Sequence, residues 1–272
     1  MIVSSYASPG TGHVVLQSDH AALASQLAEA FGNHDFEAPE PRDLMQFLAL
    51  HHDRGWDETD AHIGRNPATG LPFSLVNTPL PELLLSGPRS VDFNSRHHPY
   101  CGLLASMHVW GLFNGRYGLS DKIVVNMLAG EAKIKVDAML QTIVARRDQL
   151  TYLIAEVPAQ CHLLESSKLM QNYKLLQFFD TLSLYFNENA GRTGAYPSSD
   201  FLHVPQSSSQ DCVVSLQPLG DQVFRVAPFP FAGTELVLTH KVYDIPVHTV
   251  EVDYQKVFAA ANWTNETITL VA

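Results

Sequence analysis

The chain has 272 residues, of which 46% are hydrophobic and 17% charged, and its formal net charge is −11. This length suits one large domain, or one domain with an appendage, and allows a substantial buried core. The negative charge argues against nucleic acid as the main partner, because phosphate backbones are bound by basic surfaces. No run of about 18 consecutive apolar residues occurs, so we expect no membrane span.

The cysteine count bears on the compartment. Cys101, Cys161 and Cys212 are too few and too scattered for a disulfide framework or a cysteine-rich zinc site. The first residues lack the basic start and apolar run of a secretory signal. We therefore expect reduced thiols and a cytoplasmic protein. Thirteen histidines are the unusual part of the composition.

Residues 2–186 contain both clear and unclear secondary-structure patterns. Two β-prone runs around Ser-Pro-Gly-Thr-Gly predict a hairpin over residues 2–17. Apolar residues at helical spacing predict helices at about residues 19–31, 42–54, 100–113, 120–154 and 166–186. Residues 57–100 are rich in Pro, Gly and Asn, and predict a long irregular segment with one helical turn near residues 81–85.

The C-terminal part has a different character. Short β-branched runs separated by turn residues predict strands at residues 213–216, 222–226, 235–239, 247–252 and 267–271. Together these elements predict a mainly α fold, with an N-terminal hairpin and a C-terminal antiparallel β-rich tail. We expect residues 1–200 to form the helical domain that holds the functional site, and residues 201–272 to form a β-rich subdomain packed on it.

His20 is the first candidate site residue. It shares a helix face with Leu23, Leu27 and Phe31, and this apolar face is expected to turn inward. An inward histidine is more often a core residue than a ligand, so His20 alone is weak evidence.

His52 and Asp53 form the second candidate. His52 follows Leu44 and Leu48 at four-residue steps, and Asp53 comes next at the helix end. Neighbouring imidazole and carboxylate groups can bind one metal ion and bridge to another. Taken alone, the pair fits an ordinary helix-terminal histidine beside a solvated aspartate slightly better.

Asp180 is the most informative residue. Leu176 precedes it and Leu184 follows it at four-residue steps, so the carboxylate lies on the apolar face of a nearly uncharged helix. Burial of such a charge costs several kcal/mol unless a cation or hydrogen-bond donors meet it. A salt bridge to an arginine or a capping role would satisfy it, but a metal ion is the better explanation.

Other residues could extend a metal site. His108 follows Leu104 on a helix, and one of His97 and His98, in the loop before it, could be a further ligand. Arg54 could bind a phosphate through two parallel hydrogen bonds, with a surface salt bridge as an equal alternative. Glu58 or Asp57 could accept hydrogen bonds from ligating histidines.

The order His20, then His52 and Asp53, then Asp180 on helices resembles the HD superfamily of metal-dependent phosphohydrolases. The resemblance implies an HD-domain-like helical bundle in which these four residues bind the first metal. Extended sites of that superfamily add histidines in the interval where His98 and His108 lie here. Some of its phosphohydrolases carry a lysine shortly after the His-Asp pair, whereas this chain continues with Arg-Gly-Trp.

A more specific resemblance covers nearly the whole chain. The stretches QSDHAALA, HHDRGW, NPATGLPF, GLLASMH, LLQFFDTLSLY and APFPF are similar to a family of uncharacterised bacterial proteins catalogued as a domain of unknown function. That family implies no activity, but its histidines and aspartates fit the same metal-site interpretation.

The leading functional hypothesis is a metal-dependent hydrolase of a phosphate ester or a nucleotide-like small molecule. A divalent Mn, Fe, Mg or Zn ion would lower the pKa of a bound water, which would then attack phosphorus. One alternative is a di-iron oxygenase, because the six candidate ligands resemble those of the di-iron members of the HD superfamily. The other is a non-catalytic ligand-binding protein. The expected partner is a small-molecule substrate, with neither nucleic acid nor membrane.

Overall fold

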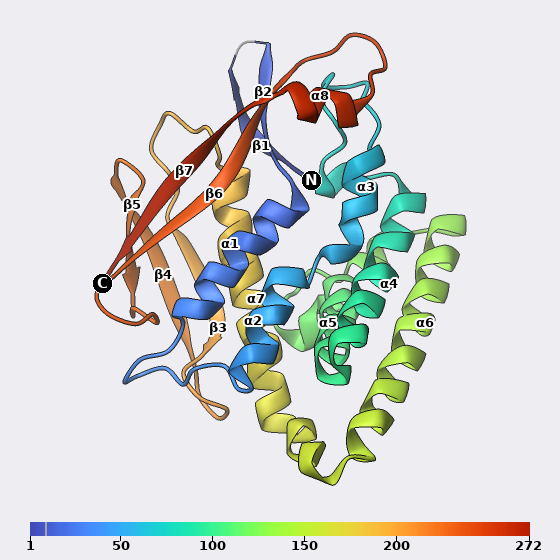
Figure 1. The fold of residues 1–272 in the computed structure, drawn as a ribbon, viewed down its shortest axis with the longest axis vertical. Helices are drawn as coiled ribbons and strands as arrows, with labels where there is room; N and C mark the ends of the chain where they lie inside the picture. Colours follow the sequence, from blue (N-terminus) through green and yellow to red (C-terminus); the bar gives the residue numbers. More distant parts are fainter. Residues whose placement is uncertain (9) are drawn as a thin grey trace.

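The computed structural model describes residues 1–8 and 10–272, and it is an α+β fold (Figure 1). Its α-helices are α1 Gln17–Ala30, α2 Arg42–His51, α3 Asp57–His62, α4 Leu80–His97, α5 Pro99–Phe113, α6 Gly130–Ala155, α7 Ser166–Glu188 and α8 Tyr254–Ala260. Its strands are β1 Ile2–Ser8, β2 Thr11–Val15, β3 Ser199–Pro205, β4 Asp211–Gly220, β5 Val223–Ala227, β6 Glu235–Pro246 and β7 Asn262–Val271. Short 3-10 helices are η1 Arg54–Trp56, η2 Leu75–Asn77, η3 Gly115–Gly118, η4 Val124–Met127 and η5 Pro158–Leu164.

All seven strands form one sheet in the order β1-β2-β6-β7-β5-β4-β3. The N-terminal hairpin joins it through the antiparallel pair β2 and β6. β7 lies between β6 and β5, antiparallel to β6 and parallel to β5. The sheet therefore combines strands from both ends of the chain, and β7 connects its two halves.

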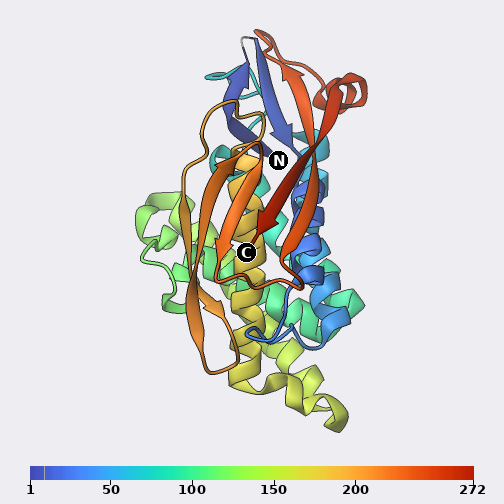
Figure 2. The ribbon, with the colours of Figure 1, turned by 90° about the vertical axis from the view of Figure 1, so that its left-hand side faces the viewer.

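Two helices, α1 and α7, pack between the sheet and the remaining helices (Figure 2). On the sheet side, Phe178 and Phe186 of α7 join a buried cluster with Phe201, Phe224 and Phe231. On the other side, a second buried cluster contains residues of α2, α4, α5, α6 and α7. Buried polar residues of α1 and α7 therefore lie in the middle of the molecule.

The predicted mainly α, HD-like bundle with an antiparallel β-rich tail is wrong. The hairpin and the C-terminal strands form one mixed sheet, with a parallel pair at β5 and β7. The helical predictions located α1, α2, α5 and α7. Of the segment predicted at residues 120–154, the part from residue 130 onward lies in α6. Strand patterns indicate which face of a strand is buried, but they do not specify its neighbour.

The predicted irregular segment at residues 57–100 is also wrong, because it contains α3 and the 18-residue helix α4. Proline misled the prediction. Pro81 lies in the first turn of α4, where its missing N–H is not needed, and Pro88 lies inside the helix. Residues 247–252, predicted as a strand, are irregular, whereas β3 has no counterpart among the predicted strands. Pro9 of the predicted hairpin turn lies outside the described residues.

Within the described residues, no helix is long and apolar enough to cross a membrane.

Candidate metal centre

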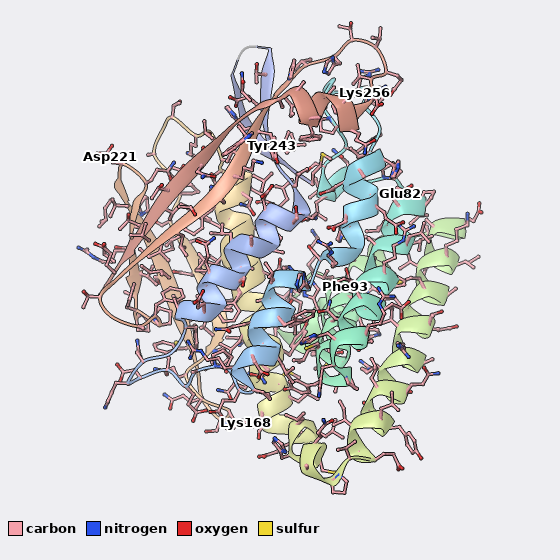
Figure 3. The ribbon with its side chains drawn as sticks, in the orientation of Figure 1. Glu82, Phe93, Lys168, Asp221, Tyr243 and Lys256 are labelled. Carbon is pink, nitrogen blue, oxygen red and sulfur yellow. The ribbon has the colours of Figure 1, made fainter. Side chains whose placement is uncertain are left out.

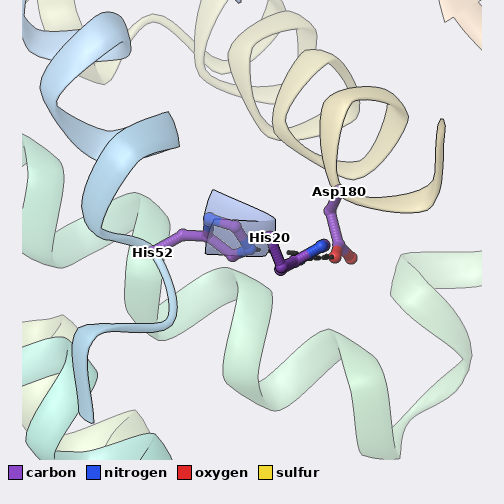
Figure 4. A group of neighbouring side chains, drawn as sticks. All are labelled: His20, His52 and Asp180. Atoms are coloured by element: carbon purple, nitrogen blue, oxygen red, sulfur yellow. Dashed lines mark ion pairs between the residues drawn. The ribbon is translucent and has the colours of Figure 1, made fainter. Parts of the chain in front are cut away.

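Four helices bring the sequence-predicted residues together in the interior. His20 comes from α1, His52 and Asp53 from the end of α2, His108 from α5 and Asp180 from α7. Two groups have ligand atoms within 4.8 Å of one another: His20, His52 and Asp180, and His52, Asp53 and His108. Figure 4 shows His20 between the imidazole of His52 and the carboxylate of Asp180.

Asp180 is buried, with 4% of its surface exposed, and its neighbours are histidines rather than an arginine. Its Oδ1 lies 3.2 Å from His20 Nε2 and 3.7 Å from His52 Nε2. Among the described residues, no arginine lies within salt-bridge distance of this carboxylate. The positive charge that a buried carboxylate requires must therefore come from an imidazolium or from a bound cation.

The tautomer of His20 follows from its hydrogen bonds. Ser183 Oγ donates its single hydrogen to the carbonyl oxygen of Asp180, at 2.9 Å. Ser183 Oγ therefore accepts from His20 Nδ1, at 3.0 Å, and Asn187 Oδ1 accepts from the same Nδ1, at 2.9 Å. A neutral imidazole carries one hydrogen, so Nε2 presents a lone pair.

The tautomer of His52 follows from its hydrogen bond in the same way. Its Nδ1 lies 2.9 Å from the carbonyl oxygen of Ala49, which can only accept a hydrogen bond. Nε2 of neutral His52 therefore also presents a lone pair, 3.7 Å from Asp53 Oδ2. Neither His20 Nε2 nor His52 Nε2 has a hydrogen-bond partner within the described residues, although both imidazoles are completely buried. Two lone pairs and two carboxylates thus converge at a position that a proton on an imidazole or a bound metal ion could satisfy.

The pKa values of His52 and Asp180 also indicate that this site requires positive charge. Burial alone would lower the pKa of His52, but the carboxylates of Asp53 and Asp180 raise it to about 9. Burial also acts to raise the pKa of Asp180, yet its contacts with His20 and His52 hold that pKa well below its usual value. In the absence of a metal, His52 therefore carries a proton at neutral pH beside an ionised Asp180.

His108 belongs to the second group and differs in charge. Burial lowers its pKa to about 4, so the imidazole is neutral at pH 7. Its Nδ1 lies 2.7 Å from the amide nitrogen of Gln177. A half-turn of this amide would place Oε1 against an Nδ1–H instead and leave His108 Nε2 as a lone-pair donor, the arrangement expected of a metal-ligating histidine.

His98, the remaining predicted ligand, has a structural role. It precedes α5, and its Nδ1 accepts a hydrogen bond from the backbone N–H of Tyr100, at 3.1 Å, as an N-terminal cap. His97 stacks on Phe47, with ring centroids 3.5 Å apart. Neither residue belongs to the two groups of converging ligand atoms.

Arg54 and Glu58, predicted as catalytic, lie on the surface and are paired with other residues. Arg54 Nη1 is 2.8 Å from Asp57 Oδ2, and Glu58 Oε2 is 2.8 Å from Arg89 Nη2. The guanidinium of Arg54 also lies over the ring of Phe93 on α4, which is labelled in Figure 3. The structure thus places both side chains in surface ion pairs rather than beside the histidines.

Sequence reasoning missed the polar residues that hold His20. Ser183 and Asn187 follow Asp180 by three and seven residues on α7, so they share its helix face. Asn187 Nδ2 also lies 2.9 Å from His240 Nδ1 of β6, and His240 Nε2 is 3.3 Å from Glu266 Oε2 of β7. The signal was available, because Asp180, Ser183 and Asn187 repeat at helical spacing on one buried face.

One of three comparisons with known proteins found a match. The family model described as "Protein of unknown function (DUF3891)" matches residues 1–246. The chain belongs to this family. All six stretches that carry the sequence resemblance lie within the matched residues, and the resemblance to an uncharacterised family is confirmed. No curated protein and no solved structure matches the DUF3891 chain.

The turn that carries His52 and Asp53 depends on Gly55, which packs against α4. Gly55 N donates to Ser90 Oγ at 2.9 Å, and a Cβ on Gly55 would lie 2.0 Å from the carbonyl oxygen of Ser86. Because that atom is backbone, Gly55→Ala must push α4 away. We expect a loss of about 1–3 kcal/mol of unfolding free energy, measured in urea. Gly194→Ala, where a Cβ meets nothing within 4 Å, is the control; equal stabilities would contradict this role.

Proposed function

We propose that this DUF3891 protein is a metal-dependent hydrolase that acts on a small phosphate-bearing molecule. One observation carries the proposal: the Nε2 atoms of His20 and His52 face one oxygen of Asp180, and neither nitrogen has a hydrogen-bond partner within the described residues. Buried polar atoms without partners are rare in folded proteins, and a cation between them would satisfy all three.

The two groups of ligand atoms support a single ion. His52 belongs to both, and its Nδ1 is already bonded to Ala49, so only Nε2 is free to bind. One imidazole nitrogen binds one metal ion. The expected set is therefore His20, His52 and Asp180, with Asp53 and His108 completing the coordination. Mixed nitrogen and carboxylate ligands suit Mn, Fe and Zn better than Mg, which prefers oxygen.

The ligand chemistry favours catalysis over a structural role. Structural zinc sites are usually closed and rich in cysteine, whereas Cys101 Sγ is directed at the carbonyl oxygen of Leu44. The side chain of Asp53 is 13% exposed, so the centre approaches solvent on that side. A divalent ion held here would supply Lewis acidity and an activated water. Ser183, Asn187 and the Ala49 carbonyl orient the ligand nitrogens beforehand.

A divalent ion held by nitrogen and carboxylate ligands, with an activated water, would suit the hydrolysis of a phosphate ester. The di-iron alternative would need His98, which caps α5 instead. With a net charge of −11, the expected substrate is a small molecule rather than nucleic acid.

The test begins with protein purified without a histidine tag. Elemental analysis should find about one ion per chain. Metal-stripped protein, reloaded in turn with Mn, Fe, Zn or Mg, should hydrolyse at least one member of a panel of phosphate monoesters, diesters and nucleotides. His52→Gln should lower both metal content and hydrolysis by about 100-fold or more, since even residues that only orient ligands contribute 10–100-fold.

His34→Gln is the matched control, because His34 is exposed and pairs only with the adjacent Asp35. Unchanged hydrolysis by His52→Gln would refute the proposal. An oxygen-sensitive absorption band from bound iron, without hydrolysis of any ester, would instead favour the oxygenase.

A further inference from the structure

A cavity of about 460 Å³ lies between α7, the segment around η3 and β3. Its polar lining includes Arg116, Lys174, Gln177, Thr181, Glu188 and Asp200. Gln177 lies three residues before Asp180 on α7, on the adjoining part of the helix surface. The cavity and the metal centre therefore lie on neighbouring sides of the same helix.

Arg116 is the positively charged side chain of the cavity lining that is not found in an ion pair with a described carboxylate. The described arginines that pair with a carboxylate through the guanidinium are Arg54, Arg65, Arg89 and Arg146. Arg116 is not among them, although its side chain is half-buried. The other cation in the lining, Lys174, pairs with Asp211. In an acidic protein, a half-buried guanidinium without a carboxylate partner is suited to an anionic ligand.

The backbone at Arg116 is strained. Arg116 and Tyr117 both adopt left-handed conformations, with φ of 51° and 59°. Each costs about 1–2 kcal/mol for a residue other than glycine. Arg147 Nη1 donates to Tyr117 Oη at 2.7 Å and helps to hold the turn. Such strain is typical of positions where the surrounding structure fixes a functional side chain.

Gln177 forms the wall between the cavity and His108. Only 6% of Gln177 is exposed, and its Nε2 contacts His108 Nδ1 at 2.7 Å. Its Oε1 is buried and has no hydrogen-bond partner within the described residues. In either orientation of the amide, one of its two polar atoms faces His108 and the other has no partner; an unsatisfied buried polar group costs about 1–3 kcal/mol, which a ligand could recover.

The acidic lining does not neutralise this end of the cavity. Glu188 lies 11 residues beyond Gln177 on α7, a distance of about 16 Å at 1.5 Å per residue. Asp200 Oδ1 accepts a hydrogen bond from Ser215 Oγ at 2.6 Å. Of the two acidic residues, Glu188 therefore lies far along the α7 wall from Gln177.

We propose that this cavity binds a small phosphate-bearing molecule, with its phosphate on Arg116 and a second polar group on the buried amide of Gln177. Arginine binds phosphate through two parallel hydrogen bonds, which gives orientation as well as charge. The inference goes beyond the proposed function, because the cavity lies across Gln177 from His108, and Arg116 would therefore hold an anionic group outside the metal centre.

The probe is inorganic phosphate, titrated by calorimetry into the metal-stripped full-length protein. Wild type should bind phosphate saturably, and Arg116→Gln, which keeps a long polar side chain at the strained position, should weaken binding at least 10-fold. Arg146→Gln, on α6 and outside the cavity, is the matched control and should stay within twofold. Arg116→Lys keeps the charge without the paired hydrogen bonds and should be intermediate; it also serves if Arg116→Gln does not fold.

The outcomes separate this inference from the proposed function. No phosphate binding by wild type, or equal affinities for wild type and both Arg116 variants, would overturn the site. In metal-loaded protein, phosphate binding lost in Arg116→Gln while hydrolysis is unchanged would keep both the site and the metal centre as separate features. Phosphate binding that depends on Arg116, without hydrolysis of any ester, would keep the site and refute the hydrolase.

Discussion

Asp180→Asn should abolish metal binding while leaving the metal-free protein folded. Asparagine keeps the shape of the side chain but removes the charge that both His20 and His52 face. In wild type, free metal at 100 times Kd should stabilise the fold by about 2.7 kcal/mol. For a chain of this size that corresponds to a rise in Tm of roughly 5–10 °C. The variant should show no such rise, and elemental analysis should find no bound ion.

The metal-free variant is expected to melt within a few degrees of metal-free wild type, because Asp53 remains beside His52. Asp244→Asn is a matched control, since Asp244 pairs with His13 at 2.9 Å but is partly exposed; it should keep the full metal-dependent rise. A large fall in Tm for Asp180→Asn, with bound metal unchanged, would show that the carboxylate is structural.

Metal affinity should increase steeply with pH. The pKa of His52 is raised to about 9, so at neutral pH an incoming ion must displace its proton. The apparent Kd should therefore fall about tenfold per pH unit from pH 6.5 towards 9. Calorimetry in buffers of different ionisation enthalpy should detect about one proton released per ion. An affinity independent of pH over this range would contradict the assignment of His52 as a ligand.

The metal-free protein should show the opposite trend. A pKa raised above the ordinary value of 6.5 means that protonated His52 stabilises the fold below pH 6.5, and that this stability is lost as pH rises through 9. The free energy of unfolding should fall by a few kcal/mol between pH 6.5 and 9, with Asp180 ionised throughout. Saturating metal should remove this fall, and thermal melts with and without metal provide the comparison.

The helices could be predicted from the sequence more completely than the sheet. Leu23, Leu27 and Phe31 repeat at the spacing of one helix face, which is a local signal. The pairing of β7 with both β6 and β5 depends on contacts between distant residues, and no local pattern specifies them. α4 was missed because Pro88 and Gly87 lie inside it, where Gly87 lets Val109 of α5 approach closely.

The sequence could predict a site residue where a charged side chain occupies a position on the apolar face of a helix. A carboxylate at Asp180 on an apolar face requires a partner, and that requirement can be read without a structure. The sequence did not distinguish His98 from His108 as a ligand. In the structure His98 precedes α5, whereas His108 faces inward from it. Arg116 gave no signal at all, since left-handed backbone in a short turn has no periodic pattern.

The position of β7 has a consequence for how the family is delimited. The family model ends at residue 246, whereas β7 runs from Asn262 to Val271. A chain shortened to the matched residues would lack the strand between β6 and β5, and would leave two smaller sheets with long unpaired edges. Such edges pair readily with other chains and promote aggregation. It would also lack Glu266, the carboxylate beside His240. The last 26 residues, although unmatched, are therefore needed to hold the strands of the matched part in one sheet.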